Sequence, residues 1–162
     1  MTMNWIVYAC LMTGLCSALV AGVFQSFSDF VMKALNAAEP SGGIEAMQLI
    51  NRVVFRSVFL VMLLGMVPSV LGLAAYSHFN LDGAAQAWIM TGAVIYVIGV
   101  FLVTMFGNVP MNNRLDSMDR AVPEATKYWR TYGVVWTRWN HVRTFGSAAA
   151  AICFLLASVT LA

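Results

Sequence analysis

Four stretches without a charged residue dominate this sequence: residues 3–28, 57–76, 84–108 and 144–162. An α-helix needs about 20 mainly apolar residues to cross the hydrocarbon core of a bilayer, and each stretch approaches or exceeds that length. Within lipid, each backbone polar group must be paired inside its own segment, which favours helices. No stretch shows the alternation of a membrane β-barrel strand. We therefore predict an all-α integral membrane protein, a four-helix bundle that crosses the bilayer four times.

The composition agrees with a membrane protein of one domain. Of the 162 residues, 60% are hydrophobic and only 10% are charged, whereas about a quarter are charged in a soluble domain. We treat residues 1–162 as a single domain, and a net charge of +2 gives no indication of nucleic-acid binding. Residues 1–5 contain no Lys or Arg, so we expect the first stretch to be a retained helix and not a cleaved signal peptide.

Basic residues predict the orientation in the membrane. All nine lie in the first and third connections between the stretches: Lys33, Arg52, Arg56, Arg114, Arg120, Lys127, Arg130, Arg138 and Arg143. The positive-inside rule places these connections in the cytoplasm and both termini outside, in a bacterial inner or plasma membrane. We also expect amphipathic interfacial helices in both connections. One covers residues 44–55 after a break at residues 40–43, and another begins at Pro123.

Two helical patterns concern packing. Small residues recur at helix-contact spacing and predict close helix approaches; they are Gly14, Ala18 and Gly22, then Gly65 and Ser69, then Gly146 and Ala150. An aromatic stripe leads into the last stretch: Trp129, Tyr132, Trp136 and Trp139. The stripe is either an interfacial belt packed against the bundle or the wall of a ligand pocket.

Polar residues gather where the helices meet the cytoplasmic connections. The group comprises Gln25, Asp29, Gln48, Asn51, Arg52, Asn108, Asn112, Trp136, Asn140, His141 and Arg143. Such side chains are costly near hydrocarbon unless they pair with one another or line a wet cavity. They therefore form either a hydrogen-bonded clasp between helices or a polar pocket open to the cytoplasmic leaflet.

The residue types narrow the chemistry of such a pocket. The two histidines, His78 and His141, are expected at opposite membrane faces, so they cannot share a metal ion or haem. Nucleotide-binding glycine motifs and paired metal-binding carboxylates are absent, and we predict no metal and no cofactor. A base and an anion-binding group remain: His141 as general base, Asp29 as its orienting group or as the base itself, and Arg143 as stabiliser of an enolate or phenolate.

Four motifs together resemble the anthrone oxygenase-like family of small membrane proteins. They are Phe27-Ser28-Asp29-Phe30, Ala46-Met47-Gln48-Leu49-Ile50-Asn51, Asn108-Val109-Pro110-Met111-Asn112, and Trp136 with Trp139-Asn140-His141-Val142-Arg143-Thr144. The resemblance implies oxidation of anthrones to anthraquinones, with O₂ as co-substrate and no classical cofactor. Carried onto this sequence, the catalytic residues are His141, Asp29 and Arg143. The substrate-binding residues are Gln48, Asn51, Asn108, Asn112, Trp136, Trp139 and Asn140.

Two functions follow from these observations. The first is a membrane-embedded oxygenase or oxidase that acts on a lipophilic anthrone-like, phenolic or quinol-like compound. The second is a non-enzymatic helper subunit or lipid-binding module, in which the polar clasp is structural. In both cases the partners are the lipid bilayer and a small lipophilic molecule.

Overall fold

Five continuous helices make up nearly all of the computed structural model, which describes residues 5–162. The first helix runs through α1 (Trp5–Ser26), the π-helical segment η1 (Phe27–Val31) and α2 (Met32–Ala37). The second and third are α3 (Pro40–Val54) and α4 (Val58–Asn80). The fourth runs through α5 (Gly83–Tyr96), the π-helical segments η2 (Val97–Leu102) and η3 (Thr104–Asn108), and α6 (Val109–Asp116), and the fifth is α7 (Pro123–Leu161). All except α3 are long and apolar enough to cross a membrane. This confirms the predicted all-α bundle with four membrane spans.

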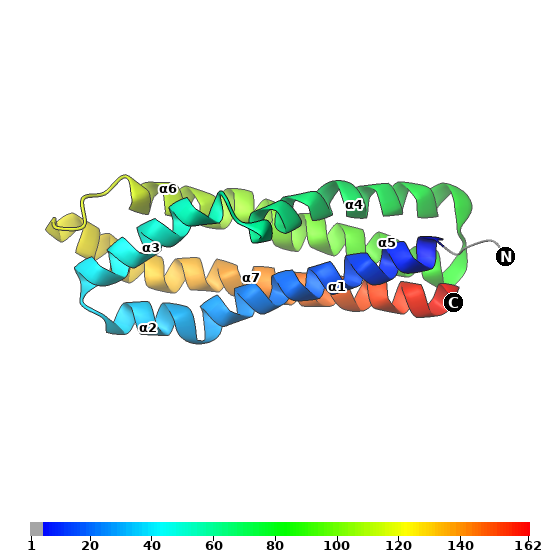
Figure 1. The fold of residues 1–162 in the computed structure, drawn as a ribbon, viewed down its shortest axis with the longest axis horizontal. Coiled ribbons are helices and arrows are strands. Elements are labelled where there is room, and N and C mark those ends of the chain that lie inside the picture. Colours follow the sequence, from blue (N-terminus) through cyan, green and yellow to red (C-terminus); the bar gives the residue numbers. More distant parts are fainter. Residues whose placement is uncertain (1–4) are drawn as a thin grey trace.

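The helices run side by side, and the beginning of α1 and the end of α7 lie at the same end of the bundle (Figure 1). Helices α2, α3 and α6 gather at the opposite end, around the first part of α7. Helix α7 has 39 residues, about 58 Å at a rise of about 1.5 Å per residue. That is nearly twice the roughly 30 Å of a hydrocarbon core, so one end of the bundle extends well beyond it.

Close contacts in the spanning region involve some of the predicted small residues. A Cβ atom added to Gly146 would lie 3.1 Å from the carbonyl carbon of Gly99, so α7 and η2 meet almost backbone to backbone. Ser17 Oγ donates to the carbonyl oxygen of Ser147 at 2.8 Å, which joins α1 to α7. The expectation was wrong for Gly22 and Gly65, because a Cβ added to either would meet no other atom within 4 Å.

The first connection is more helical than predicted. The first helix continues through η1 and α2 to Ala37, and Pro40 to Gly43 form the first turn of α3 instead of a break. A proline is well tolerated there, because the first N–H groups of a helix have no intrahelical partner. Helix α3 is amphipathic, as predicted: Ile44 and Met47 are buried, whereas the charged residues Glu45 and Arg52 are exposed.

The third connection begins later than predicted. The helix does not end at Asn108 but continues through η3 and Pro110 to Asp116. Two π-helical segments precede Pro110, and such segments mark local changes in the hydrogen-bonding ladder, often at functional sites. Pro123 starts α7, as predicted.

Candidate functional site

A partly open cavity lies where α1, η1, α3, α4, η3, α6 and α7 meet, towards the end of the bundle that carries α3. The cavity has a volume of about 160 Å³ and opens at a mouth. Ligand-binding pockets commonly have volumes of about 300–1,000 Å³. The cavity is therefore smaller than a typical ligand pocket, and its open mouth lets part of a ligand lie outside it.

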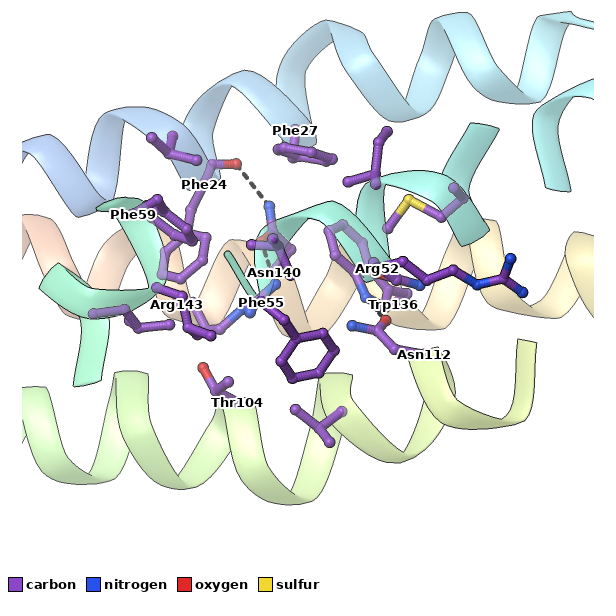
Figure 2. A pocket seen from close by; sticks show the side chains of 18 of the residues that line it. Phe24, Phe27, Arg52, Phe55, Phe59, Thr104, Asn112, Trp136, Asn140 and Arg143 are labelled. Atoms are coloured by element: carbon purple, nitrogen blue, oxygen red, sulfur yellow. Dashed lines mark hydrogen bonds between the residues drawn. The ribbon is translucent and has the colours of Figure 1, made fainter. Parts of the chain in front are cut away.

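Aromatic side chains form much of the wall. Five rings line the cavity: Phe24, Phe27, Phe55, Phe59 and Trp136. Phe24 and Phe59 meet edge to face, with their centroids 5.6 Å apart. Figure 2 shows the labelled rings around a polar group that includes Asn112, Asn140 and Arg143. A flat aromatic ligand would find apolar ring contacts here beside hydrogen-bonding groups.

Asn140 is held by three hydrogen bonds at the inner wall. Its Nδ2 atom donates to the carbonyl oxygen of Phe24 at 2.7 Å and to Ser28 Oγ at 2.6 Å. Its Oδ1 atom accepts a hydrogen bond of 2.6 Å from Arg143 Nη2. Asn140 thus ties α7 to the junction of α1 and η1, and it fixes one edge of the guanidinium (Figure 2).

Arg143 is a buried cation, with only 6% of its surface exposed. Its Cζ atom lies 4.2 Å from the ring centroid of Phe24 and 5.3 Å from that of Trp136. No carboxylate among residues 5–162 forms an ion pair with it, and its Nε atom has no hydrogen-bond partner there. The guanidinium therefore contacts aromatic faces and one neutral amide, and no counter-charge from residues 5–162 balances it.

Asn112 presents a second polar group to the cavity. Its Oδ1 atom accepts hydrogen bonds from Tyr132 Oη at 2.8 Å and from Trp136 Nε1 at 2.7 Å. Because both bonds occupy the oxygen, the amide NH₂ group faces the other way, towards the cavity (Figure 2). Asn51 Nδ2 is also buried and has no partner among the described residues. The wall is consequently rich in hydrogen-bond donors.

The exposed residues of the lining mark the mouth of the cavity. Phe55, in the turn between α3 and α4, is 71% exposed. Arg52 Nε donates to Asp116 Oδ1 at 2.9 Å, and both side chains are partly exposed. Sequence patterns did not indicate the role of Asp116, because only the folded chain brings the end of α6 to α3.

Two predicted catalytic residues do not line the cavity. His141 is exposed, and Asp29 is exposed and lies 3.6 Å from Lys33 Nζ. Successive residues of a helix point about 100° apart. Asn140 faces inward on α7, so His141 faces away, and the inward position in η1 belongs to Ser28. The predicted catalytic roles of these two side chains therefore have no support from the geometry of the cavity.

Three further predicted residues lie near the cavity without lining it. Gln48 Nε2 donates to the carbonyl oxygens of Leu115 and Met118, each at 2.9 Å, and so fastens α3 to the end of α6. Asn108 is fully buried and donates to the carbonyl oxygen of Trp136 at 3.2 Å. These two form a structural clasp. Trp139 is 42% exposed and covers Gly107.

The residues of the polar group and of the aromatic stripe thus divide between the cavity wall and the packing of the helices. Asn51, Asn112, Trp136, Asn140 and Arg143 meet at the cavity, whereas others serve packing. In the stripe, Trp129 and Trp136 stack on the two sides of Tyr132, with centroid distances of 5.5 and 5.8 Å. Only Trp136 of the stripe reaches the cavity.

The family model for anthrone oxygenase matches residues 52–153, which is more than half of the chain. The match includes Asn112, Trp136, Asn140 and Arg143, and it confirms the resemblance seen in the motifs. No curated protein and no solved structure matches the chain. The chain belongs to the anthrone oxygenase family.

Proposed function

We propose that the chain is a cofactor-independent membrane oxygenase that binds a lipophilic anthrone-like or phenolic substrate in this cavity. The observation that carries the proposal is a buried guanidinium, Arg143, within an aromatic wall, in a chain of the anthrone oxygenase family. Preorganised donors in a water-poor site stabilise a developing anion far better than water does. An electron-rich ring system with an acidic methylene group matches that arrangement.

The proposed reaction consumes one O₂ molecule. A methylene C–H bond of the substrate breaks, the proton leaves, and the electron pair remains on an enolate-type anion. The anion passes one electron to O₂, and the carbon radical and superoxide combine. The resulting peroxide takes up a proton and loses water, so that R₂CH₂ and O₂ give R₂C=O and H₂O. Arg143 stabilises the anion, and the rings of Phe24 and Trp136 hold its apolar part.

The proton requires a route out of the cavity. Asp116 is the only carboxylate among the lining residues, and it lies at the mouth in contact with Arg52. We assign to it the transfer of the proton to water. His141 and Asp29, which the sequence suggested as bases, are exposed to the outside of the bundle, so the proposal does not route the proton through them.

Oxygen consumption tests the proposed function directly. Purified protein in detergent is supplied with an anthrone, and O₂ uptake and anthraquinone formation are recorded above a protein-free blank. We expect one O₂ consumed per quinone formed. Arg143→Met should lower the rate by about 10²–10³-fold, the usual loss for one oxyanion-binding donor. Arg138→Met, an exposed residue of the same helix, should leave the rate unchanged. Wild-type uptake equal to the blank would overturn the proposal.

A second candidate function is favoured by the clasp. Gln48 and Asn108 make their hydrogen bonds within the protein, which supports a non-enzymatic lipid-binding module or helper subunit with a structural clasp. Such a protein would bind an aromatic amphiphile without consuming O₂. The same assay, run beside a binding measurement, separates the two functions.

The orientation in the membrane is also part of the proposal. Lys33, Arg52, Arg114 and Arg130 lie on α2, α3, α6 and the first part of α7, the helices at one end of the bundle (Figure 1). The positive-inside rule then places that end in the cytoplasm and the cavity at the cytoplasmic boundary.

A further inference from the structure

The charge of Arg143 is unbalanced in the folded chain. Three carboxylates at this end of the bundle are paired with other cations, Asp29 with Lys33, Asp116 with Arg52, and Glu45 with Arg120, and no carboxylate of residues 5–162 forms an ion pair with Arg143. A guanidinium does not lose its proton in proteins, so it stays charged although it is buried. The fold therefore holds a permanent positive charge at the cavity wall.

The contacts of this guanidinium leave part of its hydrogen-bonding capacity unused. Nη2 donates to Asn140, and one face of the group lies over Phe24. Nε is buried and donates to no atom of residues 5–162. Cation–π contacts offset only part of the cost of removing a cation from water, and a buried charge is normally paired as well as hydrogen-bonded.

The other polar groups of the wall also offer hydrogen-bond donors to a ligand. The side-chain oxygens of Asn112 and Asn140 are already occupied by donors from the protein. Their neighbour Asn51 has a buried Nδ2 without a partner among the described residues. A ligand that fits this wall supplies acceptor oxygens, and at least one of them carries a negative charge.

We propose that the cavity binds its ligand as an organic anion, whose charged oxygen completes the ion pair with Arg143 while its apolar body lies against Phe24, Phe59 and Trp136. The charged oxygen is a phenolate, an enolate or a carboxylate on an aromatic or lipid-like body. For the proposed oxygenase, on whose site this inference rests, the substrate binds with one oxygen already ionised, and its methylene proton leaves afterwards by way of Asp116. No buried base is needed to ionise that oxygen, in agreement with the exposed positions of His141 and Asp29.

Three matched compounds test the charge requirement without any turnover. We would use 2-hydroxyanthraquinone, its methyl ether 2-methoxyanthraquinone, and anthraquinone-2-carboxylate, which share one ring system. Binding to the purified protein is followed by tryptophan quenching, and ionisation of the bound phenol by its long-wavelength absorption. We expect the phenol to bind as phenolate below the pH at which it ionises in solution, and the ether to bind at least tenfold more weakly.

Each outcome of this comparison supports or overturns the proposed anion site. Tight binding of the carboxylate, alone or with the phenolate, supports the anion site, and its relative affinity shows which oxygen chemistry the wall prefers. Equal affinity for the ether and the phenol, with the phenol bound neutral, overturns the inference. A protein that binds the anions but consumes no O₂ with an anthrone would support this inference and contradict the proposed enzymatic function. A protein that consumes O₂ with an anthrone but binds the phenol in its neutral form, no more tightly than the ether, would support the enzymatic function and contradict this inference.

Two variants connect the effect to Arg143. Arg143→Met should abolish the preference for anions, and Arg138→Met, on the exposed side of α7, should preserve it. Asn140→Asp gives a second reading if Arg143→Met does not fold. Its carboxylate would stand where Asn140 Oδ1 now accepts from Arg143 at 2.6 Å, and so would supply an internal counter-ion. Anion affinity should then fall at least tenfold; wild-type affinity in this variant would refute the inference.

Discussion

Asn140 Oδ1 accepts a hydrogen bond of 2.6 Å from Arg143 Nη2, one turn further along α7, while the amide nitrogen of Asn140 donates to Phe24 and Ser28 on the first helix. One side chain therefore both orients the cavity cation and joins two helices that are far apart in sequence. Asn140 acts as a positioning residue, because its own polar atoms are occupied by the protein.

We expect Asn140→Leu to affect stability and activity together. The change removes three hydrogen bonds and leaves buried partners unsatisfied, at a cost of about 1–3 kcal/mol for each group left without a bond. Thermal unfolding in detergent, followed by circular dichroism, should show a lower midpoint, and the turnover of anthrone should fall. Gln25→Leu is the control, since Gln25 is exposed on the first helix. Wild-type midpoint and rate in Asn140→Leu would contradict the positioning role.

The exposed position of His141 leads to a prediction about pH. Loss of a general base typically lowers a rate by about 10²–10⁴-fold. We expect no such loss for His141→Gln, whose rate should follow wild type between about pH 5 and 8, where a histidine base would titrate. Asp116→Asn should lower the rate instead, although by less than a full base, because water reaches the mouth. Rates of O₂ uptake across this pH range provide the measurement. A large loss of rate in His141→Gln would show that His141 acts as the general base.

The spans and the inward face of α7 could be predicted because both depend on local sequence. Charge-free stretches identify membrane helices, and the spacing of Trp136, Asn140 and Arg143 places them on one face of any regular helix. The π-helical segments could not be predicted in this way. An extra residue in a turn rotates everything after it by about 100°, so the side-chain directions beyond η1, η2 and η3 do not follow from sequence spacing alone.

The mouth of the cavity could not be predicted for a different reason. Arg52 and Asp116 are 64 residues apart, and no local pattern connects them. Their contact depends on α6 continuing past Pro110, where the sequence suggested that the helix would end. The donors of the cavity wall could be proposed as a group, but which of them remain free for a ligand depends on tertiary hydrogen bonds such as that from Tyr132 to Asn112.

Membrane labelling tests the orientation. Ser117 follows α6 and Asn80 ends α4, at opposite ends of the bundle, and both are exposed. With α3 and α6 in the cytoplasm, Asn80→Cys should react with an impermeant thiol reagent applied to intact cells, and Ser117→Cys only after the membrane is opened. Wild type is the control, since Cys10 and Cys153 are buried and Cys16 is half-buried. Labelling of Ser117→Cys from outside would reverse the orientation.

The close approach of Gly99 and Gly146 leads to a last prediction, on the packing that supports the site. A methyl group on Gly146 would press on the backbone of η2, with 3.1 Å to the carbonyl carbon and 3.2 Å to the carbonyl oxygen of Gly99. A backbone cannot yield as a flexible side chain does, so the helices would have to separate. Overpacking of this kind costs about 1–3 kcal/mol, and we expect Gly146→Ala to lower the unfolding midpoint in detergent.

Gly65→Ala is the matched control for this change. A Cβ added to Gly65 would meet no other atom within 4 Å, and replacing a helical glycine by alanine usually stabilises by about 0.5–1 kcal/mol. The two substitutions are chemically identical and lie within spanning helices, so opposite shifts of the midpoint would isolate the contact between α7 and η2. Because Gly146 lies one turn beyond Arg143, Gly146→Ala should also weaken anion binding, whereas Gly65→Ala should not. Equal midpoints in the two variants would show that the backbone contact of Gly99 and Gly146 adds nothing to stability.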